Sequence, residues 1–402
     1  MKLYDELVWR GLIQDISDPK LEELLNNGGL TFYIGTDPTA DSMHIGHFSS
    51  FLLPVRLKKA GHNPILLIGG ATGLIGDPKP SNERQMISKE VAARYADALT
   101  KQAKEIFGFE VVNNYDWCKN INMLDFLRDY GKYFNINYMI DKDIIRRRME
   151  TGITFTEFSY MIIQALDFLH LYEAKGCTLQ VAGSDQWGNI TAGIELIRKK
   201  LGKEVYGFTM PLITDANGVK FGKTEGNALW LDKNKTSSYE LYQYLINTDD
   251  VIVVKYLKAF TFLDKEEIER LEKCVKEEPE KREAQEVLAK EIITFLHGKE
   301  CYERAVFVSK TLFTGKVNEL SDKEIEEVFR DVPTFELDKD IILIDFLVNS
   351  NICSSKREAR EMLTSNAINI NGSVVNDENY LIDSSRKYNI IRKGKKKYYL
   401  VK

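Results

Sequence analysis

The stretch LTFYIGTDPTADSMHIGHFSSFLLPVRL, residues 30–57, decides the fold of this chain. Residues 30–35 are mostly apolar and β-prone, which predicts a short strand that ends at Gly35. The polar turn TDPT follows at residues 36–39, and apolar residues then recur at helical spacing from Ile45 to Leu57. Strand, loop and helix in this order are the repeating unit of a parallel sheet covered by helices.

Two further segments repeat this unit. Residues 64–68 form an apolar run that ends in two glycines and the loop ATGLIGDP at residues 71–78. Residues 179–182 form another, which stops at GSDQ, residues 183–186, before a helical pattern through Arg198. Ligands of open α/β sheets bind beyond the carboxyl ends of the strands, so we expect the three polar loops to meet in one crevice. The fold class predicted for this part is α/β.

The rest of the chain differs in character. From Ser237 onward consecutive amphipathic helices are predicted, notably over residues 265–275 and 279–296. Residues 331–340, which begin with DVPT, are predicted to be a linker. Beyond it the pattern predicts a compact α+β unit, with helices at 342–347 and 356–363 and strands at 368–370, 388–391 and 398–401. The expected division is therefore an α/β domain at 1–230, a helical domain at 231–330, the linker, and a small domain at 341–402.

The composition excludes several classes of protein. With 402 residues, 44% of them hydrophobic and 29% charged, the chain has the make-up of a globular protein rather than a disordered or fibrous one. Its five cysteines are odd in number and form no CxxC, which argues against a disulfide framework or a zinc site and favours a reducing cytoplasm. The N-terminus has no signal-peptide pattern, and no apolar run approaches the roughly 20 residues that a membrane helix needs.

The charge is unevenly distributed. The whole chain has a net charge of −5, whereas residues 341–402 contain 11 Lys and Arg against 6 Asp and Glu. The run RKGKKK at residues 392–397 concentrates this positive charge. A small basic domain after an acidic body favours contact with a polyanion, although a solvated basic tail is the alternative.

The first candidate motif is DSMHIGH, residues 41–47, at the predicted start of the first helix. A helix N-terminus offers unpaired N–H groups, so the four ring nitrogens of His44 and His47 are well placed to bind a phosphate chain there. Gly46 leaves room for a base or ribose against the backbone. Taken alone, such a histidine pair is more often a surface or core feature, and no third ligand nearby supports a metal site.

The second candidate motif is KFGKT, residues 220–224, after the turn DANG at residues 215–218. Two lysines beside a glycine suit a site where negative charge grows on a departing pyrophosphate. An ordinary solvated loop is the alternative for this segment.

The third candidate lies in an otherwise apolar helix, residues 158–169. Tyr160, Gln164 and Asp167 share one face of it at positions i, i+4 and i+7. Burying a carboxylate costs several kcal/mol unless a partner hydrogen-bonds to it. Either an internal network or a polar ligand therefore satisfies this stripe, and the sequence pattern leaves both open.

Together, DSMHIGH, GSDQWGN at residues 183–189 and KFGKT, in this order, resemble the signatures of class I aminoacyl-tRNA synthetases. More narrowly, the chain resembles the bacterial-type tyrosyl-tRNA synthetase family over nearly its whole length. The resemblance implies a Rossmann-type catalytic domain, an α-helical domain and a C-terminal S4-like RNA-binding domain. It also implies a reaction: activation of L-tyrosine by ATP with Mg²⁺ to tyrosyl-adenylate and pyrophosphate, then transfer to the terminal ribose of tRNA(Tyr).

The resemblance also implies roles for individual residues. The phenolic hydroxyl of tyrosine would be held by Tyr33 and Asp167, its ammonium group by Asp77, Tyr160 and Gln164, and its carboxylate region by Gln186. ATP would contact Asp37, Gly46, Gly183 and Asp185, with Thr39, His44 and His47 on the phosphates and Lys220, Lys223, Thr224 and Arg84 on the pyrophosphate. RNA would contact Lys356, Arg357, Arg360, Lys395, Lys396 and Lys397.

Two positions depart from the family pattern. The segment after Asp77-Pro78 is shorter than in many relatives, so the role of Arg84 transfers to this chain more readily than that of Lys79. Ile34 stands where relatives often carry a cysteine that contacts the ribose.

The resemblance further implies a homodimer, for which the apolar residues 121–134 offer an interface, with no fixed metal site and neither membrane nor DNA as a partner. Two rival functions remain open: a non-catalytic RNA-binding paralogue, and the related tryptophan enzyme. Such a paralogue is expected to have lost ATP-contacting residues, which this chain retains. The tryptophan enzyme has no use for a carboxylate such as Asp167 aimed at a phenol.

Overall fold

The structure, a computed structural model, describes residues 1–78, 87–142, 145–146, 148–149, 152–215, 218, 221–222, 228–330, 332–394 and 397–402. Contacts divide the chain into two units. Unit 1 comprises residues 1–235 and 248–284, and unit 2 comprises residues 236–247 and 285–402. Unit 1 thus includes residues 248–284, which the sequence assigned to a helical domain. The four-part division itself stays a prediction.

Unit 1 is built on a parallel sheet with the strand order β3-β2-β1-β4-β5. The chain leaves β1 toward β2 and β3 on one side and adds β4 and β5 on the other, so the order reverses between β1 and β4. Such a reversal opens a crevice at the carboxyl ends of the strands. The predicted Rossmann-type α/β fold is confirmed. The strands are β1 (Thr31–Thr36), β2 (Asn63–Ile68), β3 (Glu110–Asn113), β4 (Leu179–Gly183) and β5 (Tyr206–Met210).

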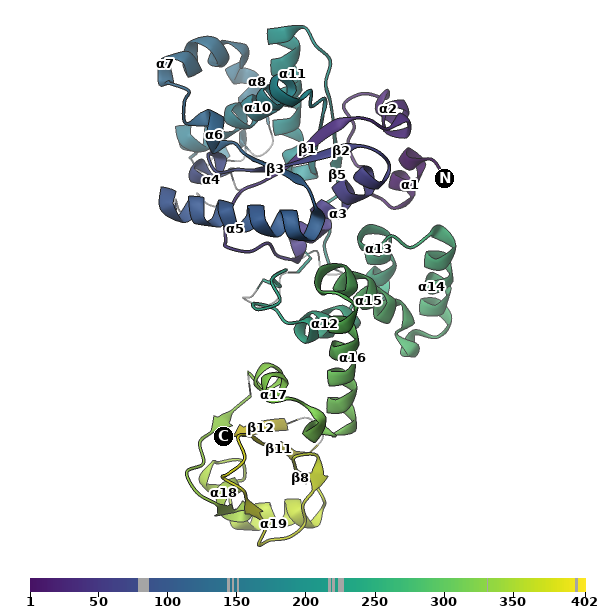
Figure 1. Ribbon diagram of the computed structural model, residues 1–402, viewed down its shortest axis with the longest axis vertical. Coiled ribbons are helices and arrows are strands. Elements are labelled where there is room, and N and C mark those ends of the chain that lie inside the picture. Colours follow the sequence, from purple (N-terminus) through teal and green to yellow (C-terminus); the bar gives the residue numbers. More distant parts are fainter. Residues whose placement is uncertain are drawn as a thin grey trace. The chain divides into compact units, whose positions relative to one another are not determined.

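Helices cover both faces of this sheet (Figure 1). On one face α10 and α11 pack against Tyr33, Ile65 and Leu67 in a continuous apolar cluster. In Figure 1, α5 lies on the opposite side of the sheet from α10. The helices and helical turns of unit 1 are α1 (Leu3–Trp9), α2 (Leu21–Asn27), α3 (Ile45–Lys59), α4 (Thr72–Ile75), α5 (Lys89–Phe107), α6 (Tyr115–Cys118), α7 (Met123–Asp125), η1 (Phe126–Tyr130), η2 (Gly131–Tyr133), α8 (Ile136–Ile140), α10 (Phe155–Lys175), η3 (Ser184–Gln186), α11 (Trp187–Leu201), α13 (Asp250–Phe260), α14 (Lys265–Glu277) and η4 (Pro279–Lys281).

Both ends of helix α10 are capped. Thr154 accepts a hydrogen bond from the Glu157 N–H, and the Glu157 carboxylate accepts one in return from the Thr154 N–H. This capping box satisfies N–H groups that the first turn leaves free. The helix ends at Gly176, whose φ of +63° favours glycine. Between these caps the helix carries Tyr160, Gln164 and Asp167 toward the crevice.

Two strands of the unit 1 sheet, β3 and β5, escaped the sequence analysis. Strand β3 has only four residues, EVVN, and begins with a charge. Strand β5 contains Gly207, which lowers β-propensity. The glycine is needed there because a Cβ at position 207 would lie 2.2 Å from Cγ2 of Ile190 on α11. Close packing therefore overrides propensity at this position.

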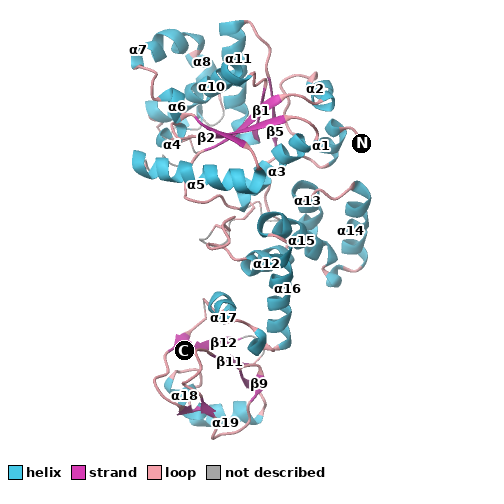
Figure 2. Ribbon diagram, viewed as in Figure 1, coloured by secondary structure: helices cyan, strands magenta, loops and turns pink. Residues whose placement is uncertain are grey.

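Unit 2 contains a second sheet, in the order β6-β12-β11-β8-β9, and a two-stranded ladder of β7 and β10 (Figure 2). The elements predicted within residues 341–402 are all present. The strands are β6 (Thr334–Phe335), β7 (Ile341–Ile342), β8 (Ile368–Ile370), β9 (Ser373–Val374), β10 (Leu381–Ile382), β11 (Asn389–Lys393) and β12 (Lys397–Val401), and the helices and turns are α12 (Ser238–Ile246), α15 (Glu283–His297), α16 (Lys299–Thr314), η5 (Val317–Glu319), α17 (Asp322–Val328), α18 (Leu343–Asn349) and α19 (Lys356–Thr364).

The small sheet is packed onto the helices of unit 2. Ile390 and Leu400, from β11 and β12, belong to one buried cluster with Val308 of α16 and with Phe329. Strand β6 lies within the predicted linker, and Thr334 pairs with Leu400 there. A two-residue strand has too little pattern to be recognised in a sequence. In the described part of the chain, no helix is long and apolar enough to cross a membrane.

Candidate active site

A cavity of about 390 Å³ opens at the carboxyl ends of β1 and β4 in unit 1. Its lining includes every described residue that the resemblance assigns to tyrosine or ATP. Arg84, Lys220, Lys223 and Thr224 lie outside the described residues. The predicted residues that line the cavity are Tyr33, Asp37, Thr39, His44, Gly46, His47, Asp77, Tyr160, Gln164, Asp167, Gly183, Asp185 and Gln186.

Asp167 lines the cavity and is buried, with only 1% of the residue exposed. The Asn114 amide donates to its Oδ2 at 3.0 Å, and the Trp117 indole N–H donates to its Oδ1 at 2.9 Å. The Cys118 thiol adds a weak donor to Oδ1 at 4.0 Å. Two carboxylate oxygens offer about four acceptor positions, so these three protein donors leave capacity for a ligand. The internal network is therefore present, and Asp167 also lines the cavity, so satisfaction by a polar ligand stays a prediction.

Burial raises the pKa of Asp167 to about 7 from an ordinary 3.8, although the donors Asn114 and Trp117 oppose the shift. Between these two values the folded state binds more protons than the unfolded state, so stability falls as pH rises. We expect the free energy of unfolding of the ligand-free protein to lose this contribution as pH rises from about 4 to about 7. Denaturant titrations of wild type and Asp167→Asn across this window measure it. Equal pH slopes in the two proteins would contradict the assignment.

Two buried polar atoms in the cavity wall lack protein partners. Within the described structure, the Tyr33 hydroxyl neither donates nor accepts a hydrogen bond, and the Gln180 Oε1 accepts none. These residues face each other in register on β1 and β4, and both line the cavity. Burial, and then the charge of Asp167, raises the pKa of Tyr33 well above its usual range, so its hydroxyl stays protonated. Buried polar groups without partners are costly, which favours a polar ligand at this end of the cavity.

A second polar cluster surrounds Asp77. Gln186 donates to its Oδ2 at 2.8 Å, and Asn189 donates to its Oδ1 at 3.5 Å and to the Gln164 Oε1 at 3.1 Å. Nearby the Tyr160 hydroxyl donates to Oδ2 of Asp37 at 3.2 Å. Carboxylates and amide oxygens gathered in a half-closed cavity favour a cation such as an ammonium group.

The two histidines cap α3 with their own rings. The Gly46 N–H donates to Nδ1 of His44 at 3.0 Å, and the His44 N–H donates to Nδ1 of His47 at 3.1 Å. Burial, and then His44, lowers the pKa of His47 to about 3, so that ring is neutral. Because each Nδ1 accepts, the hydrogen of a neutral ring sits on Nε2. The Nδ1 atoms of both rings are thus engaged by the backbone of the cap, which leaves fewer ring nitrogens for a phosphate than the four that the sequence suggested.

Gly222 lies against the start of α3. Its φ is +81°, and a Cβ there would lie 1.7 Å from Cγ2 of Ile45. Phe221 before it is buried, with ring centroids 4.7 Å from Tyr256 and 4.5 Å from Phe260. These two described residues of KFGKT therefore approach the helix that carries the histidines at backbone distance.

We expect Gly222→Ala to lower the rate of ATP–pyrophosphate exchange by about tenfold or more, because displacing a reacting site by about an ångström is costly. Tyrosine binding, measured by equilibrium dialysis, should be unchanged. Gly218→Ala is the matched control, since Gly218 has the same φ of +81° but nothing within 4 Å of a Cβ. Equal losses in both variants would show that backbone strain, not contact with Ile45, causes the effect.

The candidate RNA contacts lie in unit 2. Lys356, Arg357 and Arg360 belong to α19, and the side chain of Arg357 is 90% exposed. Each is paired with an acid, at 2.6 Å for Lys356 with Asp345. Lys397 is exposed at the start of β12, whereas Lys395 and Lys396 lie outside the described residues.

Several site residues were missed by the sequence analysis. Asn114 and Trp117 follow β3, so the signal that points to them is a polar residue and a tryptophan just after a strand that was not recognised. Gln180 is hidden inside a strand, and Asn189 was seen only within a motif. Groups of three or more metal-ligating side chains are absent from the described ranges.

Comparisons with known proteins identify the family of the chain. A family model described as tRNA synthetases class I (W and Y) matches residues 25–314. A second model, of the C-terminal domain of tyrosine–tRNA ligases, matches residues 324–401.

Individual relatives extend over most or all of the chain. The tyrosine–tRNA ligase of Listeria welshimeri is 51% identical over 100% of this chain and 99% of its own. The tyrosine–tRNA ligase of Geobacillus stearothermophilus is 49% identical over all of both chains. The solved structure of a C-terminally truncated mitochondrial tyrosyl-tRNA synthetase from Aspergillus nidulans superposes with a TM-score of 0.67, at 32% identity, over 77% of this chain and 93% of that one. The chain therefore belongs to the tyrosyl-tRNA synthetase family of the class I tRNA synthetases.

Proposed function

We propose that the chain activates L-tyrosine with ATP and transfers it to tRNA(Tyr). The observation that carries this proposal is the buried end of the cavity, where the unpartnered Tyr33 hydroxyl lies beside a carboxylate. A phenol bound there donates its hydrogen to Asp167 and accepts one from Tyr33. The reaction then follows from where the rest of the substrate lies.

The amino acid's ammonium group fits the acidic cluster of Asp77, Gln164 and Tyr160. Gln186, held by its bond to Asp77, is placed to donate to the substrate carboxylate. With both ends of tyrosine held, its carboxylate points toward the phosphate side of the cavity. Such positioning removes much of the entropic barrier to attack on a phosphorus atom.

The phosphate side of the cavity is lined by Thr39, His44 and His47. The Nε2–H groups of the two histidines donate to the α-phosphate while a carboxylate oxygen attacks it and pyrophosphate leaves. Gly183 and Asp185 hold the ribose. Gly222 lies against Ile45, and its sequence neighbours Lys220 and Lys223, which lie outside the described residues, would bind the departing pyrophosphate. Mg²⁺ arrives with ATP and neutralises phosphate charge. No protein nucleophile takes part.

The family model covers tryptophan and tyrosine enzymes alike, so the choice of amino acid rests on the cavity and on the relatives. A bound indole has no hydroxyl oxygen that could accept a hydrogen bond from Tyr33. Its N–H only donates, so the Tyr33 hydroxyl would have no acceptor. ATP–pyrophosphate exchange across the twenty amino acids tests this choice. Tyrosine alone should support exchange, whereas exchange with tryptophan would overturn the proposal. Exchange with none would favour the non-catalytic paralogue.

The second step needs RNA, and the basic residues of 341–402 support contact with tRNA through phosphates. On this proposal residues 1–230 catalyse, residues 231–330 lie along the anticodon stem, and residues 341–402 act as the S4-like domain behind a linker. All five cysteines are free, as suits a reducing compartment, and we include the cytoplasm in the proposal.

We also propose a homodimer. Large apolar side chains between residues 123 and 155 are strongly exposed, among them Met123 at 73% and Phe155 at 71%. Contiguous exposed apolar side chains of this kind mark protein interfaces. Phe155 begins α10, the helix that carries Asp167, so an interface here lies next to the element that shapes the cavity. The exposed members are Met123, Leu124, Leu127, Ile136, Tyr138, Met149 and Phe155.

We expect Phe155→Asp to convert the dimer to a monomer, because a charge buried at an interface centre costs several kcal/mol. Analytical ultracentrifugation measures the change. Phe313→Asp is the control, since Phe313 is 91% exposed but lies on α16, away from this segment in sequence. A Phe155→Asp protein that sediments as the wild type does would exclude this surface as the interface.

A further inference from the structure

Trp117 sits on a short element. Helix α6 consists of the four residues Tyr115–Cys118, a single turn after β3. Such a short helix does not by itself fix the plane of a large side chain. Yet the Trp117 indole N–H donates to Oδ1 of Asp167 at 2.9 Å, and hydrogen bonds weaken steeply when the donor tilts. Trp117 also packs against the buried apolar cluster, and a contact on the face of its ring would fix the plane of the indole further.

His170 provides that contact. Its imidazole stacks on the Trp117 ring, with 4.3 Å between centroids and 18° between planes. His170 lies three residues after Asp167 on α10, so both side chains project from the same face of one rigid helix. Helix α10 thus contacts Trp117 at two points. The His170 ring stacks on the indole, and the Asp167 carboxylate accepts the indole N–H.

We propose that His170 is a positioning residue for tyrosine recognition, which fixes the plane of the Trp117 indole and thereby aims the Asp167 carboxylate at the substrate phenol. The inference rests on the proposed role of Asp167 in holding that phenol. His170 does not line the cavity, so its action runs through Trp117.

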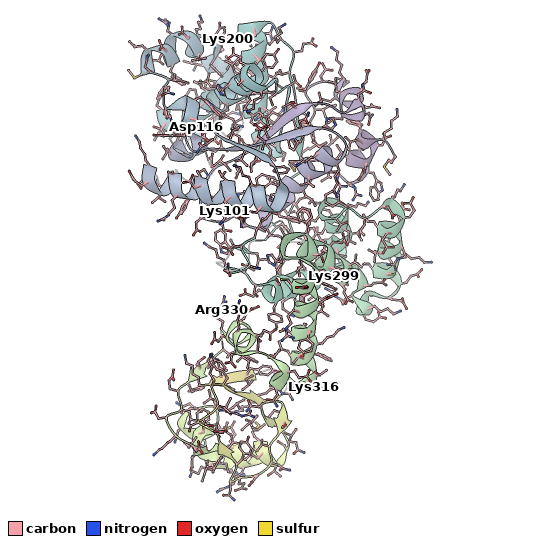
Figure 3. The ribbon with its side chains drawn as sticks, in the orientation of Figure 1. Lys101, Asp116, Lys200, Lys299, Lys316 and Arg330 are labelled. Atoms are coloured by element: carbon pink, nitrogen blue, oxygen red, sulfur yellow. The ribbon has the colours of Figure 1, made fainter. Side chains whose placement is uncertain are left out.

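The electrostatics around the imidazole support stacking as its function. Burial lowers the pKa of His170, while Glu173 raises it and Lys175 lowers it, so the ring is largely neutral near pH 7. On the α6 side, Asp116, labelled in Figure 3, is 71% exposed and pairs with Lys119 at 3.8 Å. These charges are directed to solvent and do not compete with Asp167 for the indole N–H.

The test compares His170→Ala, which removes the ring, with His170→Phe, which keeps one. For His170→Ala we expect the KM for tyrosine in ATP–pyrophosphate exchange to rise about threefold to tenfold, the range of an aromatic pair, with kcat and the KM for ATP unchanged. The preference for tyrosine over phenylalanine should fall by a similar factor. His170→Phe should restore both quantities.

A direct readout comes from the indole N–H signals of the ¹⁵N-labelled full-length protein, which contains four tryptophans. Trp117→Phe identifies the signal of Trp117. Solvent exchange of that N–H should be faster in His170→Ala than in wild type and slow again in His170→Phe. Unchanged exchange and unchanged KM in His170→Ala would overturn the proposal, as would an equal loss in both variants.

The Asp167→Asn protein separates this inference from the proposed function. If tyrosine binds elsewhere, Asp167→Asn leaves the KM for tyrosine unchanged, and the function fails. If Asp167→Asn raises that KM while His170→Ala affects neither KM nor indole exchange, only the role of His170 fails.

Discussion

Asp167→Ala should reduce kcat/KM for tyrosine by about 100-fold or more when assayed above pH 7, where the Asp167 carboxyl is mostly ionised. Hydrogen bonds to a buried charged group contribute about 1.5–3 kcal/mol each, and the substitution also strands the protein donors. Asn114 and Trp117 now donate to the carboxylate, and both would lose their acceptor. The phenol of the substrate would lose its acceptor as well. ATP–pyrophosphate exchange as a function of tyrosine concentration measures the loss, and the KM for ATP should not change.

Tyr33→Phe is the graded control for this variant. It removes one neutral hydroxyl that has no protein partner, so the expected loss is only about twofold to tenfold. Near-normal exchange in Asp167→Ala would refute the assignment of the phenol site, whatever Tyr33→Phe shows. A larger loss in Tyr33→Phe than in Asp167→Ala would place the main recognition on the neutral hydroxyl instead.

We expect the same geometry to disfavour phenylalanine. With phenylalanine bound, the Tyr33 hydroxyl and the spare acceptor positions of Asp167 would stay unsatisfied at the buried end of the cavity. Leaving buried polar groups unpaired costs more than a made hydrogen bond gains. On the proposed function, discrimination therefore rests on the polar groups that the chain buries.

The parts of the fold that were predictable carry strong local patterns. The strand and helix of residues 30–57 appear as β1 and α3 because an apolar run, a glycine and a helical period follow each other without ambiguity. By contrast, β5 is interrupted by Gly207, which a contact with Ile190 requires. Because that contact joins residues of two different elements, local propensity cannot predict it.

The site shows the same limit. Helical spacing predicted that Tyr160, Gln164 and Asp167 share one face. It did not predict which groups hydrogen-bond to them. The donors to Asp167 come from Asn114 and Trp117, about fifty positions earlier in the chain, after a strand with a weak pattern. Likewise, the engagement of both histidine Nδ1 atoms depends on a cap geometry that only coordinates reveal.

The basic face of α19 gives the second large expected effect. Replacing Lys356, Arg357 and Arg360 together by alanine should raise the KM for tRNA about 10- to 100-fold and leave ATP–pyrophosphate exchange unchanged. The three side chains are exposed, and their acidic partners lie at the surface, so the fold should tolerate their loss. Deleting residues 341–402 is a poorer test, because Ile390 and Leu400 are buried against Val308 and Phe329 and their removal uncovers that cluster.

Salt dependence distinguishes phosphate contact from a structural role. Each lost phosphate contact should lower the slope of log KM for tRNA against log salt by about one, because fewer counterions are released on binding. Arg357→Lys with Arg360→Lys is the matched control, since it keeps both charges and should keep the slope. If the triple alanine variant lost exchange and charging equally, α19 would support the fold rather than bind RNA. If charging were unaffected at every salt concentration, the tRNA contact would lie on another surface, with the excess positive charge of residues 341–402 acting only as a solvated tail.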